Sequence, residues 1–107
     1  RAAWLRDKIK SQFGLTCTTY ATSDTSSEHR TGNALDCWGT PSQMRQVADW
    51  TAANSRTLEA WYVIYAQQIW SLTRPSAGWV DMEDRGSARA NHFDHIHISM
   101  QTPSKEF

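Results

Sequence analysis

The first amphipathic pattern lies at the start of the chain. Leu5, Ile9 and Phe13 recur every four residues among charged side chains, which is the spacing of one face of an α-helix. Gly14 follows as a stop signal for that helix. The pattern therefore predicts a helix over Ala2–Phe13 that packs its apolar face on the rest of the domain.

A second helix is predicted after a clear start signal. Thr40 is the expected N-cap, Pro41 is the first helical residue, and Gln43 completes a capping box. Apolar and small side chains then follow helical spacing, at Met44, Val47, Ala48, Thr51 and Ala52. This helix is expected to lay one face on a sheet and to end near Asn54.

Three segments before the C-terminal region have the composition of β-strands. Residues 16–21 are rich in β-branched and aromatic types, and residues 33–38 can form a second short strand. Ala60–Tyr65 is apolar at successive positions, which is typical of a central strand covered on both faces. Gln67–Leu72 is interpreted as another strand or a bend. Loops are predicted for residues 22–28 and 74–91.

The final predicted element, Asp94–Met100, alternates between polar and apolar residues. His95, His97 and Ser99 fall on one face, and the apolar side chains between them fall on the other. The apolar face needs a core, so the histidines are expected to face a cleft. Asp94 is predicted on the opposite face, as a carboxylate that is solvated or paired with a loop.

Length and charge narrow the possible classes of protein. A chain of 107 residues fits one domain over residues 1–107, and its start at Arg1 suggests a piece of a longer protein. Lys plus Arg equals Asp plus Glu at 11 each, which predicts no nucleic-acid partner. No stretch approaches the roughly 20 apolar residues that span a bilayer, so we expect no membrane insertion. We also expect a monomer.

Two cysteines, Cys17 and Cys37, permit one disulfide. They are too few for a disulfide-rich scaffold and do not have the spacing of a metal motif. A bridge would constrain a loop of about 20 residues and contribute on the order of 3 kcal/mol. The alternative is a pair of buried free thiols.

The histidines and one aspartate suggest a metal site. Imidazole and carboxylate groups together suit Zn²⁺, and catalytic zinc sites use three protein ligands and one open position for water. Residues two apart on an extended strand share a face at roughly 6 to 7 Å. If His97 binds the metal, His95 lies beside the water, where it could accept a proton or stabilise an oxyanion.

A longer pattern connects this site with a known family. Ser-x-His-x-x-Gly-x-Ala-x-Asp is met by Ser27, His29, Gly32, Ala34 and Asp36, and His-x-His follows downstream. The combination resembles the signature of the lysostaphin, D-Ala-D-Ala metallopeptidase and hedgehog superfamily. Other segments resemble the peptidase-like C-terminal domain of actinobacterial secreted cell-wall proteins and related phage endolysins, namely residues 62–65, 68–70, 78–79, 85–87 and 91–99.

This resemblance implies a site, a fold and a substrate. One Zn²⁺ is held by His29, Asp36 and His97, and His95 is the catalytic group. The fold is α+β, with an antiparallel sheet that carries the zinc site on one face and helices on the other. The substrate is an amide bond in the stem peptide or cross-link of peptidoglycan. An endopeptidase is favoured over a carboxypeptidase, because the Glu-x-x-His of the carboxypeptidase branch is absent.

Several expectations accompany this hypothesis. Ser27 is a candidate for hydrogen bonds around the ligand loop, Arg30 for holding a substrate carboxylate, and His92 and Trp79 for lining the cleft. His95 has an alternative role as a group that orients a ligand. The expected location is extracellular or in the cell wall, or delivery to the wall as a phage lysis enzyme. The alternative function is a non-catalytic zinc-containing module that binds cell-wall peptides.

Overall fold

The computed structural model describes residues 2–19, 34–84, 86 and 94–100 of the chain. In this part the fold is α+β, with a six-stranded antiparallel sheet and three α-helices. The predicted α+β class and antiparallel sheet are confirmed, and α4 is a helix that was not predicted. The elements are, in order, α1 (Ala2–Phe13), β1 (Thr16–Thr18), β2 (Ala34–Trp38), α3 (Pro41–Ala53), α4 (Ser55–Leu58), β3 (Tyr62–Tyr65), β4 (Gln68–Ser71), the 3₁₀ helix η1 (Pro75–Ala77), β5 (Trp79–Asp81) and β6 (Ile96–Ser99).

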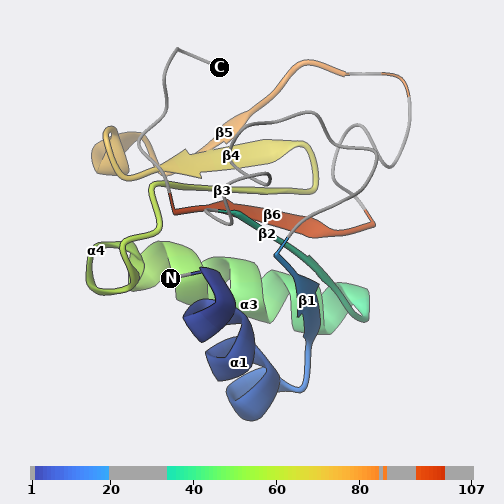
Figure 1. Cartoon of the computed structure of the whole chain (residues 1–107). Coiled ribbons are helices and arrows are strands. Elements are labelled where there is room, and N and C mark those ends of the chain that lie inside the picture. The colour runs from blue at the N-terminus through green and yellow to red at the C-terminus, as the bar shows by residue number, and fades with distance from the viewer. Residues whose placement is uncertain (1, 20–33, 85, 87–93, 101–107) are drawn as a thin grey trace.

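The strand order of the sheet is β1-β2-β6-β3-β4-β5 (Figure 1). The last strand in sequence, β6, is inserted between β2 and β3 and pairs with both. His97 on β6 therefore lies opposite Asp36 on one side and opposite Ile64 on the other. This insertion brings the aspartate of the first sequence motif beside the histidines of the second.

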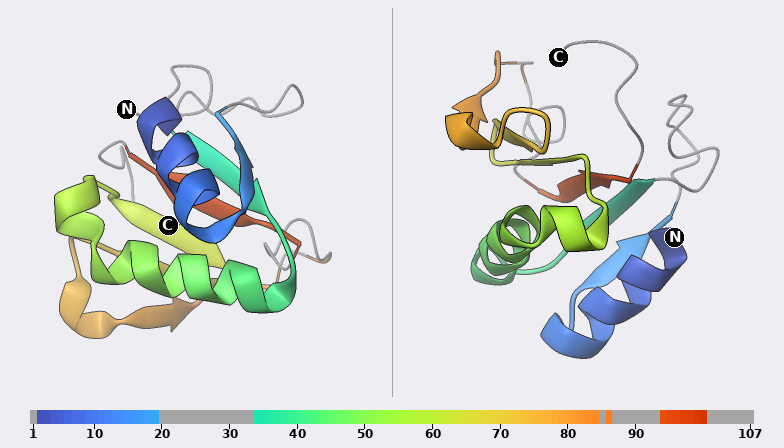
Figure 2. Two further views of the ribbon diagram at one scale, coloured as in Figure 1. Left: turned by 90° about the horizontal axis from the view of Figure 1, so that it is seen from below. Right: turned by 90° about the vertical axis from the view of Figure 1, so that its left-hand side faces the viewer.

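One face of the sheet is covered by the helices (Figure 2). α3 packs against β3, and α1 packs against β1 and β2. Leu35, Val63, Ile96 and Ile98 belong to the main core cluster and are fully buried. The apolar alternation predicted for the final strand is confirmed, because its isoleucines belong to this core.

The helix ends follow their local sequence signals. The Thr40 hydroxyl oxygen accepts from the backbone N–H of Gln43 at 3.1 Å, and the Gln43 side-chain oxygen accepts from the Thr40 N–H at 3.0 Å. Gly14 follows α1 with a φ of 75°, a conformation that costs glycine little. In the described residues no helix is both long and apolar enough to cross a bilayer.

The structure departs from the sequence prediction between residues 66 and 81. The long loop predicted over residues 74–91 contains η1 and the short strand β5, which pairs with β4. Ala66 and Gln67 form the β3–β4 turn with φ values of 53° and 63°, although neither is a residue that favours positive φ. A three-residue strand is too short for a periodic pattern, so its pairing with β4 was not visible in the sequence.

Cys17 and Cys37 form a disulfide that joins β1 to β2. The two residues are directly opposed in the antiparallel register, with their Cα atoms 4.0 Å apart. Both side chains are buried, at 7% and 0% exposure. The bridge left open by the sequence is therefore formed, and it anchors the edge strand to the strand that carries Asp36.

We expect the double substitution Cys17→Ala and Cys37→Ala to lower the free energy of unfolding by about 3 kcal/mol, because it restores chain entropy to the unfolded state. Urea unfolding followed by circular dichroism measures the difference. As a control, adding reductant should lower the free energy of unfolding of the wild type to about the value of the variant. The same reductant should leave the stability of the variant unchanged. Equal unfolding midpoints for the oxidised wild type and the variant would contradict this prediction.

Candidate functional site

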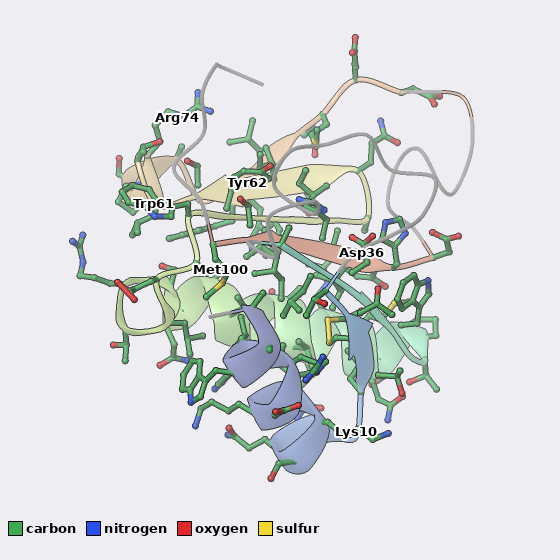
Figure 3. All side chains as sticks on the ribbon, in the orientation of Figure 1. Lys10, Asp36, Trp61, Tyr62, Arg74 and Met100 are labelled. Carbon is green, nitrogen blue, oxygen red and sulfur yellow. A yellow bond between two sulfur atoms is a disulfide. The ribbon has the colours of Figure 1, made fainter. Side chains whose placement is uncertain are left out.

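The centre of the candidate site is a carboxylate–imidazole pair. Figure 3 shows its carboxylate residue, Asp36, on the sheet face opposite the helices. Asp36 on β2 and His97 on β6 are directly paired by the register, although 61 positions separate them in sequence. Asp36 Oδ1 and His97 Nδ1 lie 3.2 Å apart. Both residues are buried, at 7% and 8% exposure. Two of the three predicted ligands therefore converge.

His95 lies beside this pair and is contacted on two sides. Its Nε2 is 3.9 Å from Asp36 Oδ1, and its Nδ1 is 2.7 Å from Asp94 Oδ1. The indole of Trp38 stacks on the imidazole, with ring centroids 5.8 Å apart and an interplanar angle of 27°. The side chain that the sequence places beside the metal ligands is therefore present there, with its Nε2 edge toward Asp36.

The prediction for Asp94 is wrong in orientation. Strict alternation along a strand would turn Asp94 away from His95, but β6 begins only at Ile96. Residues 94 and 95 form a bend, so the two neighbouring side chains can meet. The Asp94 side chain is 49% exposed, as expected of a solvated carboxylate, and it also contacts His95.

Tyr62 is a further site residue that the sequence analysis missed. Its ring stacks on the imidazole of His97, with centroids 5.6 Å apart and an interplanar angle of 22°. Tyr62 lies on β3 and is 4% exposed. Trp38 had a visible signal, because it follows Asp36 by two positions on one strand face. Tyr62 had none, because only the β3–β6 register brings it to the site.

The structure does not bring Trp79 to this cluster. Trp79 lies on β5, opposite Trp70, and packs against the main core cluster. The guanidinium of Arg45, from α3, lies 5.6 Å from the centroid of its ring. Trp79 is thus on the helix side of the sheet and does not line the site. The other predicted residues lie outside the described part of the chain, namely Ser27, His29, Arg30 and His92.

Two polar atoms of the site lie at a distance that is compatible with a shared zinc ion. Ligand atoms at about 2.0 to 2.1 Å from a tetrahedral zinc lie about 3.3 Å from each other. The 3.2 Å between Asp36 Oδ1 and His97 Nδ1 is close to that edge length and is equally a hydrogen-bonding distance. Among the residues with described positions, no group of three or more His, Cys, Asp or Glu is arranged to hold a metal ion. The third predicted ligand, His29, is not among them.

Comparison with known proteins gives a different relationship from the one inferred above. The family model described as "VldE, C-terminal domain" matches residues 1–93. An uncharacterized secreted protein of Arthroderma benhamiae is 42% identical over 53 residues, which cover 46% of this chain and 22% of that protein. No solved structure matches the chain significantly.

The family match overturns the assignment to the lysostaphin, D-Ala-D-Ala metallopeptidase and hedgehog superfamily. That assignment rested on a few residue types at fixed spacing and on several short segments elsewhere in the chain. Such residues are what a metal site requires, and the same site chemistry recurs on unrelated proteins. A short signature therefore indicates possible chemistry and does not establish the family.

Proposed function

This chain belongs to the VldE C-terminal domain family, and we propose that it is a zinc-dependent peptidase domain. The ion would be held by His29, Asp36 and His97, and His95 would be the acid–base group. The observation that supports this proposal is the convergence of Asp36, His95 and His97 on the sheet face opposite the helices.

The burial of the cluster adds to this support. Three titratable side chains meet at positions that are at most 8% exposed. Burying such groups is costly unless they are paired, and here Asp36 is paired with His97 and His95 with Asp94. A group of polar side chains that converge in this way is a candidate for a functional site.

The proposed roles follow from the positions of the atoms. Zinc, when bound, supplies a Lewis acid for the scissile carbonyl and lowers the pKa of a water molecule. Asp36 and His97 present an anionic oxygen and an imidazole nitrogen 3.2 Å apart, which suits two ligands of one ion. His95 Nε2 lies on the same side, where it can take a proton from the attacking water and return it to the leaving amine.

We propose cell-wall peptides, in the stem or cross-link of peptidoglycan, as the substrate. With the superfamily assignment overturned, the support for this substrate is the location of the protein. The disulfide and the secreted relative suggest an extracellular protein. Cell-wall peptides are among the substrates that an extracellular peptidase can reach.

The purified chain provides the test. We expect stoichiometric zinc by elemental analysis, and we expect new amino groups after incubation with peptidoglycans of different cross-link types. Mass spectrometry of defined muropeptides would identify the bond. Stoichiometric zinc without cleavage of any wall type or muropeptide would contradict the peptidase proposal.

A second candidate function is a zinc-containing module that binds cell-wall peptides without cutting them. Trp38 favours it, because this indole is 38% exposed at the end of the otherwise buried strand β2, directly beside the polar cluster. Exposed aromatic rings provide contact area for extended ligands. Wall binding that survives His95→Ala, together with no turnover by the parent, would favour this module.

A further inference from the structure

We infer that Asp94 is a positioning residue for His95. Asp94 Oδ1 accepts a hydrogen bond at His95 Nδ1, and this contact directs the Nε2 edge of the ring toward Asp36. The catalytic consequence of this arrangement rests on the proposed function. The protonation pattern itself exists with or without turnover, so it can be tested separately.

The first step of the argument is the contact between the two neighbouring residues. Asp94 Oδ1 and His95 Nδ1 are 2.7 Å apart, at the short end of the range for hydrogen bonds between imidazole and carboxylate. An ionised carboxylate only accepts hydrogen bonds, so the ring nitrogen that faces it carries the hydrogen. A neutral imidazole has one such hydrogen, and Nε2 is then its basic atom.

The second step concerns the other edge of the ring. His95 Nε2 lies 3.9 Å from Asp36 Oδ1, which is beyond hydrogen-bonding distance. Between these two carboxylates, Asp94 therefore makes the shorter contact with the imidazole of His95. The Asp36 oxygen instead lies 3.2 Å from His97 Nδ1. Asp36 therefore pairs with His97, and Asp94 pairs with His95.

The third step is the fixed plane of the imidazole. Trp38 stacks on His95 at an interplanar angle of 27°, and His95 is 8% exposed. A ring that is packed on one face and hydrogen-bonded at one edge has little freedom to rotate. The direction of Nε2 is thus set before any substrate arrives, as efficient acid–base catalysis requires.

The conservative variant Asp94→Asn separates positioning from folding. Asparagine has nearly the same shape, but its amide can present either an acceptor oxygen or a donor N–H to Nδ1, whereas a carboxylate only accepts. We expect ¹⁵N NMR at alkaline pH, where imidazoles are ordinarily neutral, to show His95 protonated at Nδ1 in the wild type. In Asp94→Asn the population protonated at Nδ1 should fall, while Asp94→Glu should keep the proton on Nδ1.

The kinetic readout is a fall in kcat with little change in KM. For Asp94→Asn we expect a decrease of about 10- to 100-fold, the usual effect of removing a hydrogen-bond partner that orients an active-site histidine. Zinc content and thermal unfolding should be unchanged. Asp49→Asn is the matched control, because it removes the exposed carboxylate that pairs with Arg45 on α3 at 3.7 Å.

The possible outcomes are distinguishable. Protonation of His95 at Nε2 in the wild type would overturn the inference. A shifted tautomer with unchanged kcat would overturn the positioning role. The expected tautomers in a protein that cleaves no peptide would leave the Asp94–His95 arrangement supported, and the failure would then belong to the proposed function.

Discussion

Replacing His97 by Ala is expected to abolish zinc binding and peptide cleavage together. The substitution removes one of the two donor atoms that the sheet register brings to 3.2 Å from each other. Asp36→Asn should act in the same direction, because the amide loses the negative charge that attracts the ion. Elemental analysis after dialysis measures bound zinc, and release of amino groups from peptidoglycan measures activity.

The same variants should lose the stabilisation that zinc gives to the folded state. An ion that binds only the native protein stabilises it by about 4 kcal/mol when its concentration is 1,000 times the dissociation constant. A chelator should therefore lower the melting temperature of the wild type and leave His97→Ala unchanged. Asp81→Asn is the control, because this carboxylate accepts from Gln68 between β4 and β5, away from the site. Full zinc content in His97→Ala would exclude His97 as a ligand.

Replacing His95 by Gln is expected to lower kcat by about 10²- to 10⁴-fold, the usual contribution of a positioned acid–base group. Zinc content should stay at the wild-type level, because the proposed ligands are untouched. A lower kcat together with an unchanged zinc content would assign different roles to the two histidines of the His-x-His pair. Single-turnover kinetics on a defined muropeptide, with zinc measured on the same sample, provide the data.

Two results would reverse this division of roles. Loss of zinc from His95→Gln would make His95 a ligand and remove it as the proton acceptor. Unchanged kcat with full zinc would leave His95 as a structural neighbour of Asp36. Trp4→Phe is a suitable control for nonspecific effects, because Trp4 is 53% exposed on α1, on the opposite side of the sheet.

The disulfide and the site share one strand. Cys37 follows Asp36 directly, and Trp38 comes next, so the bridged residue lies between a proposed ligand and the ring that packs on His95. The alternation of the strand sends the Cys37 side chain into the core and its two neighbours to the other face. The covalent link to β1 can therefore stabilise the strand without occupying the site.

The sequence by itself determined the elements whose signals are local. The capping box at Thr40 and Gln43, the apolar spacing of α1 and α3, and the alternation of the final strand were all confirmed. Each depends on residues a few positions apart, which is the range over which periodicity and caps act. The same reasoning placed His97 on the face opposite the core, whereas His95 lies in the bend just before β6.

Tertiary structure decided what depends on strand pairing. The insertion of β6 between β2 and β3 put Asp36 opposite His97 and moved Tyr62 to the site, while β5 took Trp79 to the other face. The bend before β6 brought the side chain of Asp94 into contact with His95, whereas the sequence analysis had assumed strand alternation at this position. Register and bends result from contacts between distant segments, so no local pattern contains them. The residue types of the candidate site could be identified in the sequence, but the residues that they contact could not.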